Sequence, residues 1–217
     1  MSLGAWPDGV FRYRALDAAA WLKRNRPNPK ILDQLALEKA RPIIVMRTEE
    51  SFAAYLEGKA SDAAPVIGPV IEAILDLKLD AQIVVSTRYG RQAPVLKQRF
   101  GAKVKILDHV IDTTSLLHYS TIFIGSGGTM TVEAALLGKP AISCFPGPKT
   151  LYMKYLEDHG LMKTIRSPTR IARATAEAIV SRSVEDRQGR KGRELLRRME
   201  DPIRVVSLAV KKTWKGV

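Results

Sequence analysis

Short apolar runs recur along this chain, and most are followed by a stretch with apolar residues at helical spacing. Six runs have the length and composition of buried strands: 42–47, 82–86, 104–107, 122–124, 141–145 and 162–165. The intervening segments favour helices at 65–77, 93–100, 113–119, 129–137 and 168–181, and another helix opening near residue 50. Alternation of this kind requires right-handed crossovers between parallel strands. We therefore expect an α/β fold: a doubly wound, Rossmann-like parallel sheet of about six strands with helices on both faces.

In such a sheet, ligands bind at the carboxyl ends of the strands. The side chains that follow the predicted strands are therefore the first candidates for a site, and they include Arg47, Arg88 and His109. Two guanidinium groups near one sheet edge indicate an anionic ligand. Instead of contacting a ligand, Arg47 could form an ion pair with a nearby glutamate such as Glu49. His109 could instead be a loop histidine whose ring is held by a cap.

The turn after the fourth predicted strand is the most informative motif. Gly125, Gly127 and Gly128 remove side chains where the backbone turns from strand to helix. The N–H groups and positive dipole end of the next helix suit a phosphate. The turn is neither a P-loop nor a complete GxGxxG motif. Glu133, one helical turn later, could accept hydrogen bonds from a sugar diol. The alternative for the turn is a purely structural role, and the alternative for Glu133 is a carboxylate that is favoured near the helix amino terminus by the helix dipole.

The two ends of the chain are expected to lie outside this domain. Residues 1–40 have no core of their own, so we predict the linker of a missing amino-terminal lobe, with a short strand at 10–14 and a short helix at 31–37. Residues 41–182 would form the Rossmann-like domain. Residues 183–217 would form a basic helical tail, interrupted near Asp201-Pro202.

Charge and cysteine content narrow the classes of partner. The formal net charge is +13, and residues 166–217 hold 14 Lys and Arg against 6 Asp and Glu. This excess favours an anionic partner, either a nucleotide sugar or an anionic membrane surface with the tail as the contact. A nucleic acid is the weaker alternative because no recognised binding motif is present. Cys144 is the single cysteine, which excludes an intrachain disulfide and favours a reducing, cytoplasmic compartment.

The segment 125–133, the apolar strand before it and the Leu-Gly-Lys-Pro sequence at 137–140 together resemble the donor-binding, carboxyl-terminal lobe of GT-B glycosyltransferases. That group includes the murein-precursor N-acetylglucosaminyltransferase and the UDP-N-acetylglucosamine 2-epimerases. The overall sequence is similar to an uncharacterised, largely archaeal family of predicted glycosyltransferases. The resemblance extends over about residues 40–180.

The resemblance implies a site for a nucleotide sugar, with UDP as the expected nucleotide. Four residues of the turn would donate hydrogen bonds to the diphosphate: Ser126, Gly127, Gly128 and Thr129. Glu133 would accept hydrogen bonds from the ribose hydroxyls. No metal or other cofactor is implied, because the helix dipole and the guanidinium groups would stabilise the leaving diphosphate.

Other candidate contacts are also implied by the resemblance. The segment 109–112, with His109 and Val110, would lie under the base, and Arg47 would face the phosphates or the sugar. Apart from the resemblance, we expect Arg88, Arg91 and Gln92 at the rim of the cleft rather than inside it. Two residues after the loop at 145–148 could meet the sugar: Lys149 and Tyr152.

Two departures separate this chain from the epimerases. Met46 replaces the histidine of the epimerase pattern at the first strand, although Arg47 and Glu49 are retained. The interval from Ser126 to Glu133 matches the murein transferase and is one residue longer than in the epimerases. The sequence therefore favours a glycosyltransferase over an epimerase. Because the lobe expected to bind the acceptor is missing, we expect the fragment alone to bind donor without turnover.

Overall fold

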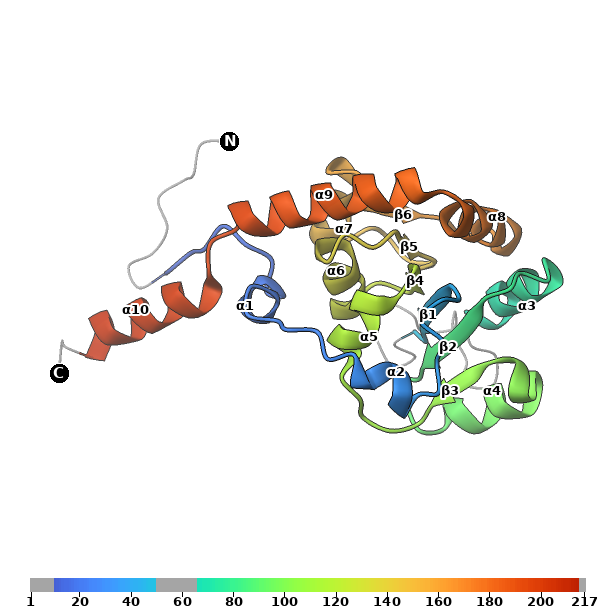
Figure 1. The fold of residues 1–217 in the computed structure, drawn as a ribbon. Coiled ribbons are helices and arrows are strands. Elements are labelled where there is room, and N and C mark those ends of the chain that lie inside the picture. Colours follow the sequence, from blue (N-terminus) through green and yellow to red (C-terminus); the bar gives the residue numbers. More distant parts are fainter. Residues whose placement is uncertain (1–9, 50–65, 215–217) are drawn as a thin grey trace.

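The computed structural model describes residues 10–49 and 66–214. Its centre is one parallel six-stranded sheet with strand order β3-β2-β1-β4-β5-β6 (Figure 1). The strands are β1 Ile43–Arg47, β2 Gln82–Ser86, β3 Lys105–Leu107, β4 Ile122–Gly125, β5 Ala141–Ser143 and β6 Met162–Thr164. Each predicted strand is present, within two residues of the expected bounds. The prediction of an open, doubly wound α/β sheet is confirmed.

Helices connect the strands and continue beyond the last one. They are α1 Ala19–Leu22, α2 Lys30–Gln34, α3 Gly68–Asp76, α4 Gln92–Phe100, α5 Thr113–Tyr119, α6 Thr129–Leu136, α7 Leu151–Asp158, α8 Pro168–Val180, α9 Arg182–Arg198 and α10 Pro202–Trp214. The helix expected near residue 50 lies outside the described residues. α1 and α7 were not predicted. α3 begins at Gly68 rather than at residue 65, with Pro69 in its first turn.

Alternate residues of each strand pack against opposite helical layers. In β1, Ile43 and Val45 face a core shared with α1, α2, α5, α6, α7 and α9. Ile44 and Met46 face a second core, shared with α3, α4 and α8. Figure 1 shows the sheet between these two layers. This arrangement explains why the strands consist of continuous apolar runs: both faces of the sheet are buried.

The amino-terminal segment packs on the sheet domain. Ala19 and Leu22 of α1 and Ile31 of α2 are buried in the same core as α5 and α6. The strand predicted at 10–14 is wrong: these residues form no strand. Among the described residues, no strand pairs with this alternating segment, and the Arg14 carbonyl instead accepts the Glu200 N–H at 3.1 Å.

The two helices of the carboxyl-terminal segment differ in their packing. α9 lies close against α6, and an added Cβ on Gly192 would be 2.6 Å from the Gly138 backbone. Leu195 and Met199 bury their side chains in the core beside it. α10 projects away from the sheet and packs near α1 (Figure 1). In the described part of the chain, no helix is long and apolar enough to cross a membrane.

Candidate nucleotide site

The turn after β4 has a backbone conformation that favours glycine. Gly127 and Gly128 both have φ of +84°, a region that residues with a Cβ rarely adopt. A Cβ on Gly125 would lie 2.8 Å from the Phe123 ring. α6 begins directly after the turn at Thr129, and no side chain caps its amino terminus. The turn therefore presents backbone donors and the positive end of a helix dipole at the carboxyl end of β4.

A cavity of about 360 Å³ opens beside this turn. It lies where β1 and β4 are neighbours, although the chain passes through β2 and β3 between them. This reversal of strand order is the switch point at which open α/β sheets bind ligands. Seven predicted site residues line the cavity: Arg47, Glu49, Arg88, Ser126, Gly127, Gly128 and Thr129.

The two arginines are positioned by polar contacts beneath the cavity. Arg47 Nη1 donates to Ser86 Oγ at 2.5 Å. The Arg88 N–H donates to Thr48 Oγ1 at 2.8 Å and to Gln92 Oε1 at 3.0 Å. Gln92 was expected at the rim of the cleft, but it is completely buried. Its amide instead anchors the loop that carries Arg88, because a buried amide requires hydrogen-bond partners.

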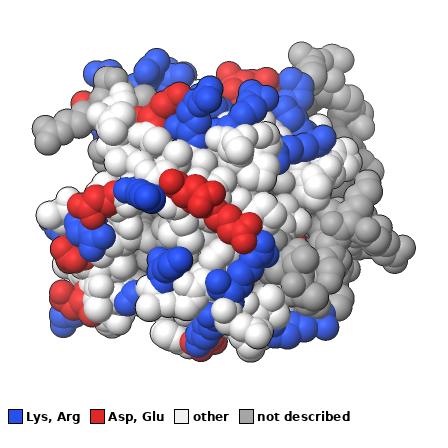
Figure 2. All heavy atoms as spheres, turned by 90° about the vertical axis from the view of Figure 1, so that its right-hand side faces the viewer, with Lys and Arg blue, Asp and Glu red and all other residues white. Residues whose placement is uncertain are grey.

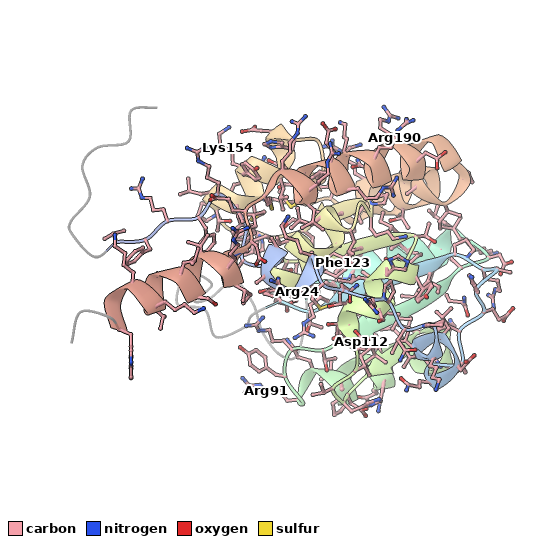
Figure 3. All side chains as sticks on the ribbon, turned by 60° about the vertical axis from the view of Figure 1, so that its left-hand side comes forward. Arg24, Arg91, Asp112, Phe123, Lys154 and Arg190 are labelled. Carbon is pink, nitrogen blue, oxygen red and sulfur yellow. The ribbon has the colours of Figure 1, made fainter. Side chains whose placement is uncertain are left out.

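Two other charged residues near the site have different surroundings. The buried Glu49 carboxylate accepts the Val66 N–H through Oε1 at 3.0 Å, so part of its hydrogen-bonding capacity is used within the fold. Arg91 lies at the outer end of the β2–α4 loop (Figure 3), with its guanidinium carbon 6.0 Å from the Tyr89 ring centroid. Arg91 does not line the cavity.

A second cavity, of about 430 Å³, adjoins the first. The two share Arg47, Arg88 and Met130, so together they follow the carboxyl edge of the sheet from β4 towards β3. His109 and Val110 line the second cavity, and Val110 is 99% exposed. An exposed apolar side chain beside a cavity offers a surface on which a planar ring can pack.

The acidic group beside His109 is held in its charged form. Asp108 accepts from Lys97 Nζ at 2.6 Å and lies 3.1 Å from His109 Nδ1. The hydrogen bond from Lys97, and then the one from His109, lower the pKa of Asp108 to about 2. His109 therefore has a carboxylate neighbour that fixes its ring, and it remains 66% exposed at the second cavity.

Glu133 lies outside both cavities. It is only 6% exposed, and Thr114 Oγ1 donates to its Oε2 at 3.1 Å. Burial raises the pKa of Glu133, whereas hydrogen bonds from Thr114 and Trp21 oppose the shift and the Asp112 charge adds to it. Asp112 itself caps α5 by accepting the Ser115 N–H at 3.0 Å. The carboxylate expected to face ribose is thus covered by α1.

Another part of the cavity wall comes from α7 and the loop before it, which includes Phe145 and Thr150. Arg166 holds this loop by donating to the Gly147 carbonyl at 2.9 Å. Tyr152 lies on the cavity wall, whereas Lys149 is paired with Glu157 at 2.6 Å. The apolar positions 153 and 156, which are buried in α7, were the sequence signal for this helix.

The fold has counterparts among solved structures. The open six-stranded α/β sheet matches the lobes of GT-B glycosyltransferases. It is similar to the structure described as an S. aureus MnaA-UDP complex, with a TM-score of 0.62, 14% identity, and coverage of 87% of this chain and 49% of that one. It is also similar to the glycosyltransferase SnogD from Streptomyces nogalater, with a TM-score of 0.57, 19% identity, and coverage of 87% and 46%.

The particular family follows from the sequence itself. Residues 1–215 match the family described as Protein of unknown function (DUF354), and the chain belongs to it. An uncharacterized protein of Methanocaldococcus jannaschii is 33% identical over 127 residues, which cover 58% of this chain and 35% of that protein. The UDP-GlcNAc 2-epimerase of the same organism matches with a TM-score of 0.53, 15% identity, and coverage of 77% and 47%. The chain thus spans half or less of the length of these relatives.

Proposed function

We propose that this chain is the nucleotide-sugar-binding, carboxyl-terminal lobe of a glycosyltransferase. The observation that carries the proposal is the convergence of the glycine turn, the α6 amino terminus, Arg47 and Arg88 on one cavity at the switch point. Backbone donors and two guanidinium groups suit the charge of a diphosphate. The UDP complex of the structurally similar MnaA protein supports this ligand class.

The two adjoining cavities suggest an arrangement of the ligand. The diphosphate would lie at the turn 126–129, and the base would lie in the second cavity beside His109 and Val110. Ribose would then lie between them, near the shared residues Arg47 and Met130. A ribose contact from Glu133 would require the Trp21 side chain to move, because Trp21 donates a hydrogen bond to the carboxylate in this conformation.

The second half of the enzyme would be supplied by another lobe. Four apolar side chains form a stripe along α10 that is at least half exposed: Ile203, Val206, Val210 and Trp214. Their spacing places them on one side of the helix. The structurally similar proteins are about twice as long as this chain, which supports a lobe packed on this stripe. We expect donor binding without turnover from the present chain.

An epimerase activity is the alternative within the same fold, because the UDP-GlcNAc 2-epimerase of M. jannaschii also matches. The position of Met46 favours the transferase. Its side chain is completely buried in the core with α3, α4 and α8, and it lies outside both cavities. A methionine packed in this way supplies no acid or base to a bound sugar.

A thermal-shift panel of UDP, GDP, CMP, their sugar conjugates and NAD tests the proposal. A ligand at one hundred times its dissociation constant stabilises the folded state by about 2.7 kcal/mol, roughly 5–10 °C for a domain of this size. We expect stabilisation by UDP and UDP-sugars, with no effect from uridine or sugar alone at equal concentration. Absence of a shift with every nucleotide would contradict the proposal.

A further inference from the structure

Tyr152 brings a phenol to the glycine turn from a separate element of the fold. It is the second residue of α7, and its hydroxyl oxygen accepts the Gly128 N–H at 2.8 Å. An added Cβ on Gly127 would lie 3.2 Å from the same oxygen. The hydroxyl is therefore in contact with the part of the turn to which the proposed function assigns the diphosphate.

The hydroxyl has one proton left to donate. A phenol accepts and donates at the same oxygen, and within residues 10–49 and 66–214 no acceptor is found for the Tyr152 proton. Tyr152 lines the same cavity as Arg47 and Arg88. Met153 and Leu156 are buried, so α7 is fixed on the core and holds the phenol at the cavity wall.

We propose that Tyr152 is a phosphate-binding residue of this site. It would donate its O–H to a diphosphate oxygen while it continues to accept the Gly128 N–H, so that the phenol takes the place expected of the Gly128 N–H as a donor to the diphosphate. This inference rests on the proposed function, since it assigns a further contact to the same ligand. A hydrogen bond accepted by an oxygen polarises its O–H and strengthens the bond it donates. The phenol thus adds an uncharged hydrogen-bond donor to the backbone donors of the glycine turn.

The test compares two tyrosines on one helix. Tyr155 is 37% exposed, packs against His159 with ring centroids 4.3 Å apart, and lies outside the cavity. Y152F and Y155F each remove one hydroxyl and keep the ring. Calorimetric titrations of the wild type and both variants use UDP and uridine, with thermal melts to establish that each variant is folded.

We expect Y152F to weaken UDP binding about tenfold, since a hydrogen bond to a charged group carries at least that much. Uridine lacks the diphosphate, so its titration should give the same result in the wild type and Y152F, and Y155F should bind UDP like the wild type. If the wild type binds UDP and Y152F binds it equally well or more tightly, Tyr152 is not a phosphate donor, although the proposed site stands. If the wild type binds no nucleotide, both proposals are wrong.

Discussion

Arg47 occupies the boundary between the two cavities, at the end of β1, and lines both. Its guanidinium is oriented by Ser86, whose hydroxyl accepts from Nη1. Charge-assisted hydrogen bonds from a guanidinium to phosphate are among the stronger polar contacts in proteins. Under the proposed function, this side chain would lie within reach of the diphosphate from either cavity.

We predict that Arg47→Ala weakens UDP binding about tenfold or more, the loss expected for one hydrogen bond to a charged group. Isothermal titration calorimetry at fixed ionic strength measures the effect. Arg190→Ala is the matched control, because Arg190 is exposed on α9 and lies outside both cavities (Figure 3). Equal losses in the two variants would indicate that only net charge matters.

Glu133 makes a prediction about pH. Burial raises its pKa, so the folded state binds the proton more readily than the unfolded state does. Ionisation of Glu133 therefore lowers the free energy of unfolding. This loss increases as pH rises from the unfolded-state pKa to the folded-state pKa and is complete above the latter. Glu133→Gln removes the charge and keeps an acceptor for Thr114. The variant should gain stability relative to the wild type at pH 7.5, and the gain should shrink towards pH 4.

Urea unfolding at several pH values measures that difference. Glu194→Gln is a suitable control, because Glu194 is an exposed carboxylate paired with Arg198 on α9. If Glu133→Gln changes the free energy of unfolding by the same amount at pH 4 and pH 7.5, burial does not raise the pKa of this carboxylate.

At the scale of elements, the contact between α6 and α9 depends on paired glycines. Replacing Gly192 by Ala improves helix propensity by about 1 kcal/mol, but the new Cβ would lie 2.6 Å from backbone atoms of Gly138. Backbone cannot move aside as a flexible side chain does. The clash should therefore exceed the propensity gain.

We predict that Gly192→Ala lowers the free energy of unfolding by about 1–3 kcal/mol, the range for overpacked sites. Chemical denaturation monitored by circular dichroism provides the measurement. Gly90→Ala serves as the control, since an added Cβ there meets no atom within 4 Å. Stabilisation by Gly192→Ala would show that α9 is free to move away from α6.

The position of α1 over Glu133 makes a second prediction at this scale. If Glu133 is a ribose ligand, Trp21→Ala should strengthen UDP binding by removing the side chain that covers the carboxylate. The double variant Trp21→Ala/Glu133→Ala should lose this gain. The coupling between the two substitutions, measured by titration, isolates the contact. Tighter binding that persists in the double variant would exclude Glu133 as its source.

For the whole molecule, the distribution of charge is more informative than its sum. Figure 2 shows cationic and anionic side chains interspersed over the face that carries α3, α4 and α8. The pair between Arg99 and Glu72, at 2.7 Å, is one example from α4 and α3. On α10, Arg204, Lys211 and Lys212 instead accompany the exposed apolar stripe. This helix is therefore the element to test for a partner lobe or an anionic membrane.

We predict that the backbone amides of α10 exchange with solvent much faster than those of α9, because the main contact of α10 with the described part of the chain is with α1, whereas α9 contacts both α6 and α8. Hydrogen–deuterium exchange of this chain gives the comparison. In a longer family member that contains a preceding lobe, α10 should become protected. If the amides of α10 become protected from exchange only when anionic vesicles are added, and not when the preceding lobe is present, the result would favour membrane attachment.

The sequence by itself determined the sheet of this protein and the turn after β4. Continuous apolar runs specified the six strands because both sheet faces are buried, and the glycines at 127 and 128 specified a turn with positive φ. The order of strands and helices then placed Arg47 and Arg88 at the carboxyl edge beside that turn. All of these features depend on local pattern and on the handedness of crossovers.

Only the tertiary structure decided which side chains meet at the site. Tyr152 reaches Gly128 across 24 positions of sequence, and Trp21 covers Glu133 across more than one hundred. The pattern 10–14 has strand-like alternation but no partner strand, so it forms none. Local pattern encodes what conformation a segment favours, whereas contacts between distant segments depend on the packing of whole surfaces. That is why the glycine turn was predictable from the sequence, whereas the contact between Trp21 and Glu133 was not.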